Sequence, residues 1–112
     1  MLKRTSTHPG EIREDIRGGR GRARWVEVLG PGEMAGVRAT ALLTLEPGAS
    51  IGEHQHTDTE ELYLVLEGSG TGILDGERFP IGPGDAWVCT SGQSHGLEVG
   101  TDTPLRLLAL LT

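Results

Sequence analysis

Four side chains in this chain combine residue types and spacing suited to binding a metal ion. His54 and His56 are two positions apart, and on an extended strand such residues project from the same face because successive side chains alternate between faces. Glu61 follows shortly after this pair, and a lone His95 lies further along the chain. Imidazole nitrogens and carboxylate oxygens are common ligands of divalent metals. The sequence therefore predicts one divalent metal ion bound by His54, His56, Glu61 and His95.

The segments that carry these residues are predicted to be β-strands. From Trp25 onward, short runs of β-type residues alternate at regular intervals with glycine and proline, and no segment after residue 20 has a sustained helical period. Asp75-Gly76, between two alternating apolar runs, predicts a tight hairpin. The fold class is therefore all-β, a sandwich or barrel with little or no helix. Strands are predicted near residues 25–29, 37–45, 50–56, 61–67, 70–74, 77–81, 85–89, 95–99 and 105–111.

The chain is expected to form a single domain that follows an irregular segment. Its 112 residues are enough to surround one hydrophobic core. Residues 1–24 are predicted to be an irregular lead-in with one helical turn around Ile12 and Ile16, and this lead-in is a candidate arm for contact with a second subunit. Residues 25–112 are predicted to form the domain itself.

Composition and charge exclude several classes of protein. The formal net charge is −6, and the arginine- and glycine-rich run 17–24 contains no aromatic residue, so nucleic-acid binding is not expected. The apolar run 105–111 is interrupted by Arg106 and is too short to cross a bilayer, and the N-terminus has no hydrophobic signal segment. The single cysteine, Cys89, excludes an internal disulfide. We expect a cytoplasmic protein without membrane or nucleic-acid partners.

A strand with two apolar faces indicates a second subunit. Tyr63 and Val65 share a face with Glu61, whereas Leu62, Leu64 and Leu66 occupy the other face. A half-exposed strand should have one polar face, so the leucine face is expected to pack on a second sheet or on a partner. The run 105–111 likewise has apolar residues on both faces of its predicted strand. We expect a homodimer.

The histidine-rich segment resembles the first motif of the cupin family, and a later segment resembles the second. The first motif places a glycine, a His-x-His pair, a glutamate and a final glycine at fixed spacing, and every position is matched by Gly48, His54, His56, Glu61 and Gly68. The second motif is matched in part, by Gly84, Gly92 and His95, while Thr90 stands in place of its proline and Val99 in place of its asparagine. The resemblance covers roughly residues 40–111.

The resemblance implies a cupin jelly-roll barrel, also called a double-stranded β-helix, formed by residues 25–112. It selects Glu61 rather than the adjacent Glu60 as a ligand, because only Glu61 places Gly68 at the required spacing. It favours manganese, iron or nickel as the single divalent metal, and the ligand types also suit zinc, cobalt or copper. Four protein ligands would leave about two positions open on a six-coordinate ion.

Two functions are consistent with such a site. The first is a metal-dependent enzyme of the oxygenase, decarboxylase or isomerase type that acts on a small oxygen-rich organic molecule, with Glu61 and Tyr63 as candidate catalytic residues. The alternative is a non-catalytic module that binds or senses a small ligand or a sugar. Arg78 and Arg106 are the only cations after residue 38, and Arg38 is a third candidate for the pocket. This scarcity favours a neutral or phenolic ligand, or one held chiefly by the metal. Trp25 and Trp87 are expected to be core or interface anchors.

Overall fold

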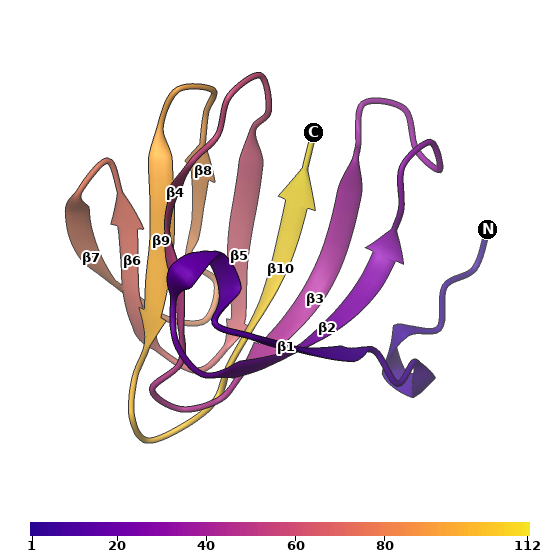
Figure 1. Cartoon of the computed structure of the whole chain (residues 1–112). Coiled ribbons are helices and arrows are strands. Elements are labelled where there is room, and N and C mark those ends of the chain that lie inside the picture. Colours follow the sequence, from indigo (N-terminus) through magenta and orange to yellow (C-terminus); the bar gives the residue numbers. More distant parts are fainter.

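The chain folds into two antiparallel sheets that enclose a common interior. The computed structural model describes residues 1–112 (Figure 1). The six-stranded sheet has the order β1-β2-β3-β10-β5-β8 and the four-stranded sheet the order β4-β9-β6-β7. The elements are the short 3₁₀ turns η1 (Thr5–Thr7) and η2 (Ile16–Gly18) and the strands β1 (Glu11–Glu14), β2 (Arg22–Leu29), β3 (Ala39–Leu45), β4 (Ser50–Gln55), β5 (Glu61–Glu67), β6 (Gly70–Leu74), β7 (Glu77–Ile81), β8 (Ala86–Cys89), β9 (Ser94–Val99) and β10 (Leu105–Leu111).

From β3 onward the chain passes repeatedly from one sheet to the other. Strands β3, β5, β8 and β10 belong to the six-stranded sheet, and β4, β6, β7 and β9 to the four-stranded sheet. This alternation winds the two sheets around each other as a jelly-roll barrel (Figure 1). The prediction of an all-β jelly roll with little helix is confirmed. No helix in the structure combines the length and apolar character needed to span a membrane.

Aliphatic side chains fill one end of the barrel and leave the other end for polar groups. Leu107 of β10 stands opposite Leu43 of β3 and Val65 of β5, and all three are almost completely buried. Toward the start of β5, the residues that point inward are Tyr63 and then Glu61. The strand that helps to build the core therefore also carries a carboxylate to the open end of the barrel.

The leucine face of β5 points away from the barrel interior. Leu62 and Leu64 are half-buried, whereas Tyr63 and Val65 on the opposite face are fully buried. It is thus the tyrosine face, not the leucine face, that packs toward the second sheet. Contact of the leucine face with a partner subunit stays a prediction.

Glycines occupy the turns that need a left-handed backbone. Asp75 and Gly76 have φ values of 48° and 79° and join β6 to β7, which confirms the predicted hairpin. Gly68 has a φ of 85°, and a β-carbon there would collide with the carbonyl oxygen of Pro104. The final glycine of the first motif is therefore explained by both conformation and space.

The first 24 residues are more regular than the sequence predicted. Glu11–Glu14 forms β1, which pairs with β2 at the edge of the six-stranded sheet, and β2 begins at Arg22 rather than near Trp25. All four residues of β1 are exposed, so the strand has no apolar alternation that a sequence pattern could reveal. The predicted helical turn is present only at Ile16–Gly18, since Ile12 lies within β1.

Candidate metal centre

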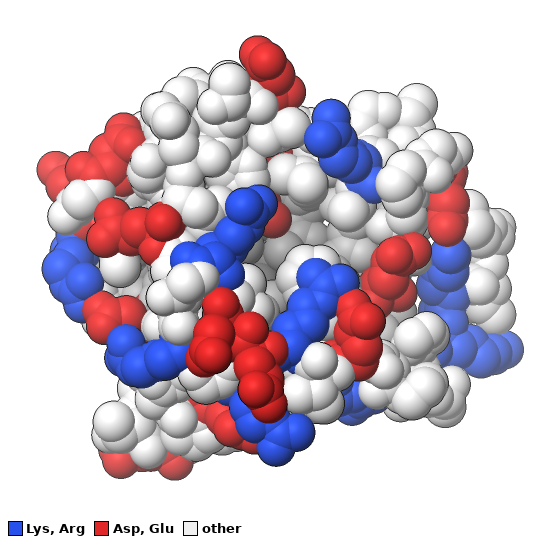
Figure 2. Space-filling model, in the orientation of Figure 1, with Lys and Arg blue, Asp and Glu red and all other residues white.

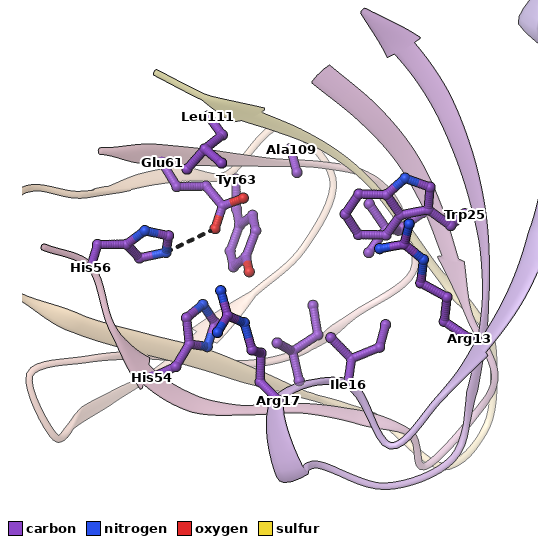
Figure 3. Close-up of a pocket in the computed structure, with 12 residues that line it drawn as sticks. Arg13, Ile16, Arg17, Trp25, His54, His56, Glu61, Tyr63, Ala109 and Leu111 are labelled. Atoms are coloured by element: carbon purple, nitrogen blue, oxygen red, sulfur yellow. Dashed lines mark ion pairs between the residues drawn. The ribbon is translucent and has the colours of Figure 1, made fainter. Parts of the chain in front are cut away.

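The four predicted ligands converge at the open end of the barrel from both sheets. His54 lies near the end of β4 and is paired in register with His95 of β9. His56 follows directly after β4, and Glu61 is the first residue of β5. Figure 3 shows His54, His56 and Glu61 directed toward one space, together with the Tyr63 ring. Side chains separated by up to 41 positions in the sequence are therefore brought together by the pairing of β4 with β9.

The distances between the donor atoms are those of ligands that share one ion. His95 Nε2 lies 3.1 Å from His54 Nε2, 3.0 Å from His56 Nε2 and 3.0 Å from Glu61 Oε1. His56 Nε2 lies 3.2 Å from the same carboxylate oxygen. One donor atom from each residue can be chosen so that all lie within 4.8 Å of one another. This cluster suggests a single metal site.

The spacing favours ligands at right angles around the ion. Two ligands that are each about 2.1 Å from an ion lie about 3.0 Å apart at a right angle and about 3.4 Å apart at a tetrahedral angle. The four contacts of 3.0 to 3.2 Å are closer to the first value. A six-coordinate ion held by these four residues would keep positions open for a further ligand.

Hydrogen bonds at the opposite ring nitrogens orient two of the imidazoles. His54 Nδ1 donates to the carbonyl oxygen of Gly52 at 2.8 Å, and because a carbonyl only accepts, the proton of His54 resides on Nδ1. His56 Nδ1 lies 2.9 Å from the hydroxyl of Thr59. The Nε2 lone pair of His54 is then directed at the cluster. His56 Nε2 faces the cluster too, and it offers its lone pair there when the Thr59 hydroxyl accepts the proton of Nδ1, as in metal sites whose ligands are fixed by outer groups.

Burial keeps these imidazoles neutral. Burial lowers the pKa of His54, and the charges of His95, Arg17 and His56 lower it further. Burial also lowers the pKa of His56, although the Glu61 carboxylate opposes the shift. Neutral imidazoles are the form that binds metal, so no proton has to be displaced near neutral pH. The histidine lone pairs and the Glu61 carboxylate repel one another when they face the same space. A divalent cation bound between them would attract all of these groups.

Tyr63 lies beneath the cluster and faces the same space. Its ring stacks on His95 with centroids 4.5 Å apart and packs edge-on against Trp87 at 5.3 Å. The phenol oxygen points toward the space between His54 and Glu61 (Figure 3). Burial raises the pKa of Tyr63 well above its ordinary value, and the Glu61 carboxylate raises it further. Tyr63 is therefore a core aromatic that also presents a proton-bearing hydroxyl to the site.

A cavity of about 170 Å³ opens in front of the cluster. Besides His54, His56, Glu61 and Tyr63, its lining includes four residues from the segment before the barrel and from β2: Arg13, Ile16, Arg17 and Trp25. Figure 2 shows basic side chains at the rim of the hollow in the middle of this face. The arginines of the cavity therefore come from the part of the chain that was predicted to be irregular.

The expectation of a neutral or phenolic ligand rested on the wrong arginines. Arg38, Arg78 and Arg106 are not among the residues that line the cavity. Arg78 is instead bound to Glu98, and Arg106 lies 3.9 Å from Glu67. Sequence reasoning missed both Arg13 and Arg17. The pairing of β1 with β2 carries Arg13 to the cavity, and the contact of η2 with β4 carries Arg17 there.

Trp25 lines the cavity, whereas Trp87 is a core residue as expected. Trp87 is 8% exposed and belongs to the main apolar cluster. Trp25 is covered by Arg13, whose guanidinium carbon lies 3.9 Å from the centre of the indole ring. Trp25 thus packs against the core, as expected, and is also a wall of the cavity.

Comparisons with known proteins agree with this geometry. Residues 41–111 match the family model described as Cupin domain. An oxalate-binding protein of Thermotoga maritima is 34% identical over 112 residues, which span 99% of this chain and 93% of that protein. A crystal structure from Thermotoga maritima, described as a predicted oxalate decarboxylase, superposes with a TM-score of 0.95 at 34% identity and covers 99% of this chain and 97% of its own.

A more distant structure has the same fold. A sugar phosphate isomerase from a cupin superfamily in Silicibacter pomeroyi superposes with a TM-score of 0.71 at 27% identity, covering 80% of this chain and 59% of its own. The matched family model, the similarity to the Thermotoga maritima protein and the clustered histidines agree: this chain belongs to the cupin domain family.

Proposed function

We propose that this chain binds a small carboxylate anion, with oxalate as the first candidate, at a divalent metal held by His54, His56, Glu61 and His95. The observation that carries the proposal is that three members of the ligand cluster, His54, His56 and Glu61, line one small cavity together with Arg13 and Arg17. The fourth member, His95, is fully buried against them. Open positions on the metal would take carboxylate oxygens, and arginine favours the negative charge. The relatives named for oxalate support this choice of ligand.

The metal would supply Lewis acidity, while the residues of this chain determine what can approach it. The cavity of about 170 Å³ admits only a small molecule. Its walls are largely apolar, including Ile16, Leu43 and Ile51, so the polar groups of a ligand would be matched only at the metal cluster and at the arginines. The resemblance to cupins favours manganese, iron or nickel, while the ligand types also suit zinc, cobalt or copper.

The test is a calorimetric titration of oxalate into manganese-loaded protein and into the same protein stripped with a chelator. We expect saturable binding of about one oxalate per chain only when the metal is present. Binding of equal strength to the stripped protein would contradict the metal-dependent site. An absence of binding to the loaded protein would contradict oxalate as the ligand.

A second candidate function is decarboxylation of the bound anion, which the position of Tyr63 favours. Loss of carbon dioxide leaves an electron pair on carbon that must accept a proton, and the buried Tyr63 phenol retains its proton. Formation of carbon dioxide and formate from oxalate by the metal-loaded protein, with slower formation in Tyr63→Phe but unchanged oxalate binding, would support this function. Binding without any product would leave the chain as a binding module.

We also propose that two copies of the chain associate through the outer face of the six-stranded sheet. Leu42 of β3, Leu108 of β10 and Leu64 of β5 are adjacent in register on this face, and all are half-buried. Half-exposed leucines in a continuous patch are typical of subunit interfaces.

A further inference from the structure

We infer that Arg17 determines the specificity of the metal centre for an anion, and that the segment before the barrel is shaped to place this arginine over the site. The inference rests on the proposed function, because it concerns the ligand of the same cavity. It assigns a role to a residue outside the matched cupin region, residues 41–111.

Arg17 is the arginine of the cavity whose charge is not already matched within the chain. It lines the cavity together with His54 and His56, and Figure 3 shows its guanidinium beside the His54 ring. None of the ion pairs of the structure includes Arg17. Arg13, in contrast, donates to Glu11 Oε1 at 2.8 Å and lies over the Trp25 ring. An arriving anion would therefore find Arg17 available.

The position of Arg17 depends on a close contact between two stretches of backbone. A β-carbon at Gly52 would collide with the carbonyl oxygen of Arg17, and a β-carbon at Gly19 would collide with the carbonyl oxygen of Ser50. The turn η2 therefore rests directly on β4, two residues before His54. Side chains at either glycine would hold η2 away from β4 and the arginine away from the metal cluster.

The backbone of Arg17 is itself strained. Its φ of 54° and ψ of 36° lie in the left-handed region, which is unfavourable for residues with a β-carbon. Such conformations are found where the surrounding structure imposes them, often at binding sites. Here the strained residue is the one that carries the unmatched charge.

The metal and the Arg17 guanidinium together define the chemical class of the ligand. A guanidinium group presents parallel N–H donors that match the two oxygens of a carboxylate. A ligand that uses one end for the metal and the other for Arg17 needs an oxygen-donor group at each end, and the small cavity limits the spacer between them. This arrangement fits a short dicarboxylate or a 2-oxo acid better than a sugar or a phenol.

The experiment compares oxalate binding by manganese-loaded wild type, Arg17→Gln, Arg17→Lys and the control Arg22→Gln. Arg22 is exposed, lies 3.7 Å from Glu14 and does not line the cavity. Removing a charge-assisted contact should weaken oxalate binding between about tenfold and a hundredfold in Arg17→Gln. Arg17→Lys should lose less, and Arg22→Gln should match wild type. Bound manganese, measured by elemental analysis, and binding of imidazole, a neutral ligand of the metal, should be equal in all four proteins.

Three outcomes have distinct meanings. Weaker oxalate binding in Arg17→Gln, with equal manganese content and equal imidazole binding, supports the inference. Equal oxalate affinity in wild type and Arg17→Gln overturns the role of Arg17 and leaves the proposed function standing. Failure of manganese-loaded wild type to bind oxalate overturns the proposed function and, with it, the assignment of Arg17.

Discussion

Single hydrogen bonds outside the ligand cluster orient two of its three histidines. His54 is held by the Gly52 carbonyl and His56 by the Thr59 hydroxyl. Without these partners each ring could rotate or change tautomer, and its metal-directed lone pair would be lost part of the time. The site therefore depends on residues that are not ligands.

Thr59→Val should weaken metal binding although it leaves all four ligands intact. The substitution keeps the shape of the side chain but removes the oxygen that lies 2.9 Å from His56 Nδ1. Loss of such an outer hydrogen bond typically reduces metal affinity by about ten- to a hundredfold. Titration of manganese against a competing chelator would measure the change. Thr57→Val is the matched control because Thr57 is exposed, and equal affinities in the two variants would contradict the role given to Thr59.

Tyr63 should ionise at a higher pH than an exposed tyrosine. Burial raises the pKa of its phenol, so the folded protein keeps the proton where the unfolded chain would lose it. The resulting stabilisation is complete below the pKa of an ordinary tyrosine, about 10, and is lost as the pH rises from there toward the folded-state pKa. Because Tyr63 is the only tyrosine, phenolate absorbance can be followed directly during a pH titration. A midpoint at the ordinary tyrosine pKa would show that the ring is not buried.

The metal cluster could be predicted at the residue level because its signal is local. The i and i+2 spacing of His54 and His56 fixes their common face once the segment is a strand. Arg17 carries no comparable signal, because its place over the cavity depends on the contact of η2 with β4 in three dimensions. Sequence reasoning therefore identified the four residues that cluster and missed the charge beside them.

At the scale of elements, hydrophobic alternation and turn residues predicted the strands of the barrel. The ranges expected for β5, β6, β7 and β10 agree with the structure. Strand β1 was missed because all its residues are exposed, so it has no alternation of apolar and polar residues. Contacts between backbones, including that of Gly19 with β4, produce no pattern of side-chain types in the sequence.

Gly19→Ala should therefore weaken oxalate binding and leave metal binding unchanged. The backbone of Gly19 has a φ of −73°, which alanine tolerates, so the effect of the substitution is steric. The added β-carbon would push η2 off β4 and move Arg17 away from the cavity. We expect a loss of oxalate affinity similar to that of Arg17→Gln, with unchanged manganese content. The control is Gly82→Ala, at a turn where a β-carbon meets open space. Gly18→Ala is less suitable because Gly18 has a positive φ. If Gly19→Ala bound oxalate as tightly as wild type, the claim that the contact of η2 with β4 positions Arg17 would be contradicted.

At the scale of the whole molecule, the two faces of the six-stranded sheet have different roles. The inner face supplies the core and the carboxylate ligand, while the outer face carries the leucine patch. A barrel of this size leaves that patch partly in water, which is unfavourable unless another surface covers it. A second copy of the chain is the partner that we propose.

Leu108→Asp should convert the proposed dimer into a monomer. Leu108 lies between Leu42 and Leu64 in register, so a charge there would be buried in the middle of the interface. Size-exclusion chromatography with light scattering would measure the mass of each species. Thr101→Asp, at an exposed loop position, should keep the wild-type mass. A wild-type protein with the mass of one chain would refute the dimer.

The central claim is that the barrel holds one divalent metal through His54, His56, Glu61 and His95. The most direct measurement is elemental analysis of tag-free wild type and His95→Ala, both purified without chelating or nickel resin and with circular dichroism as a check on folding. We predict about one equivalent of manganese, iron or nickel in wild type and almost none in a folded His95→Ala protein, because His95 Nε2 lies within 3.1 Å of a donor atom of each of the other three ligands. Equal metal content in the two proteins, or no metal in wild type even after reconstitution, would contradict the account.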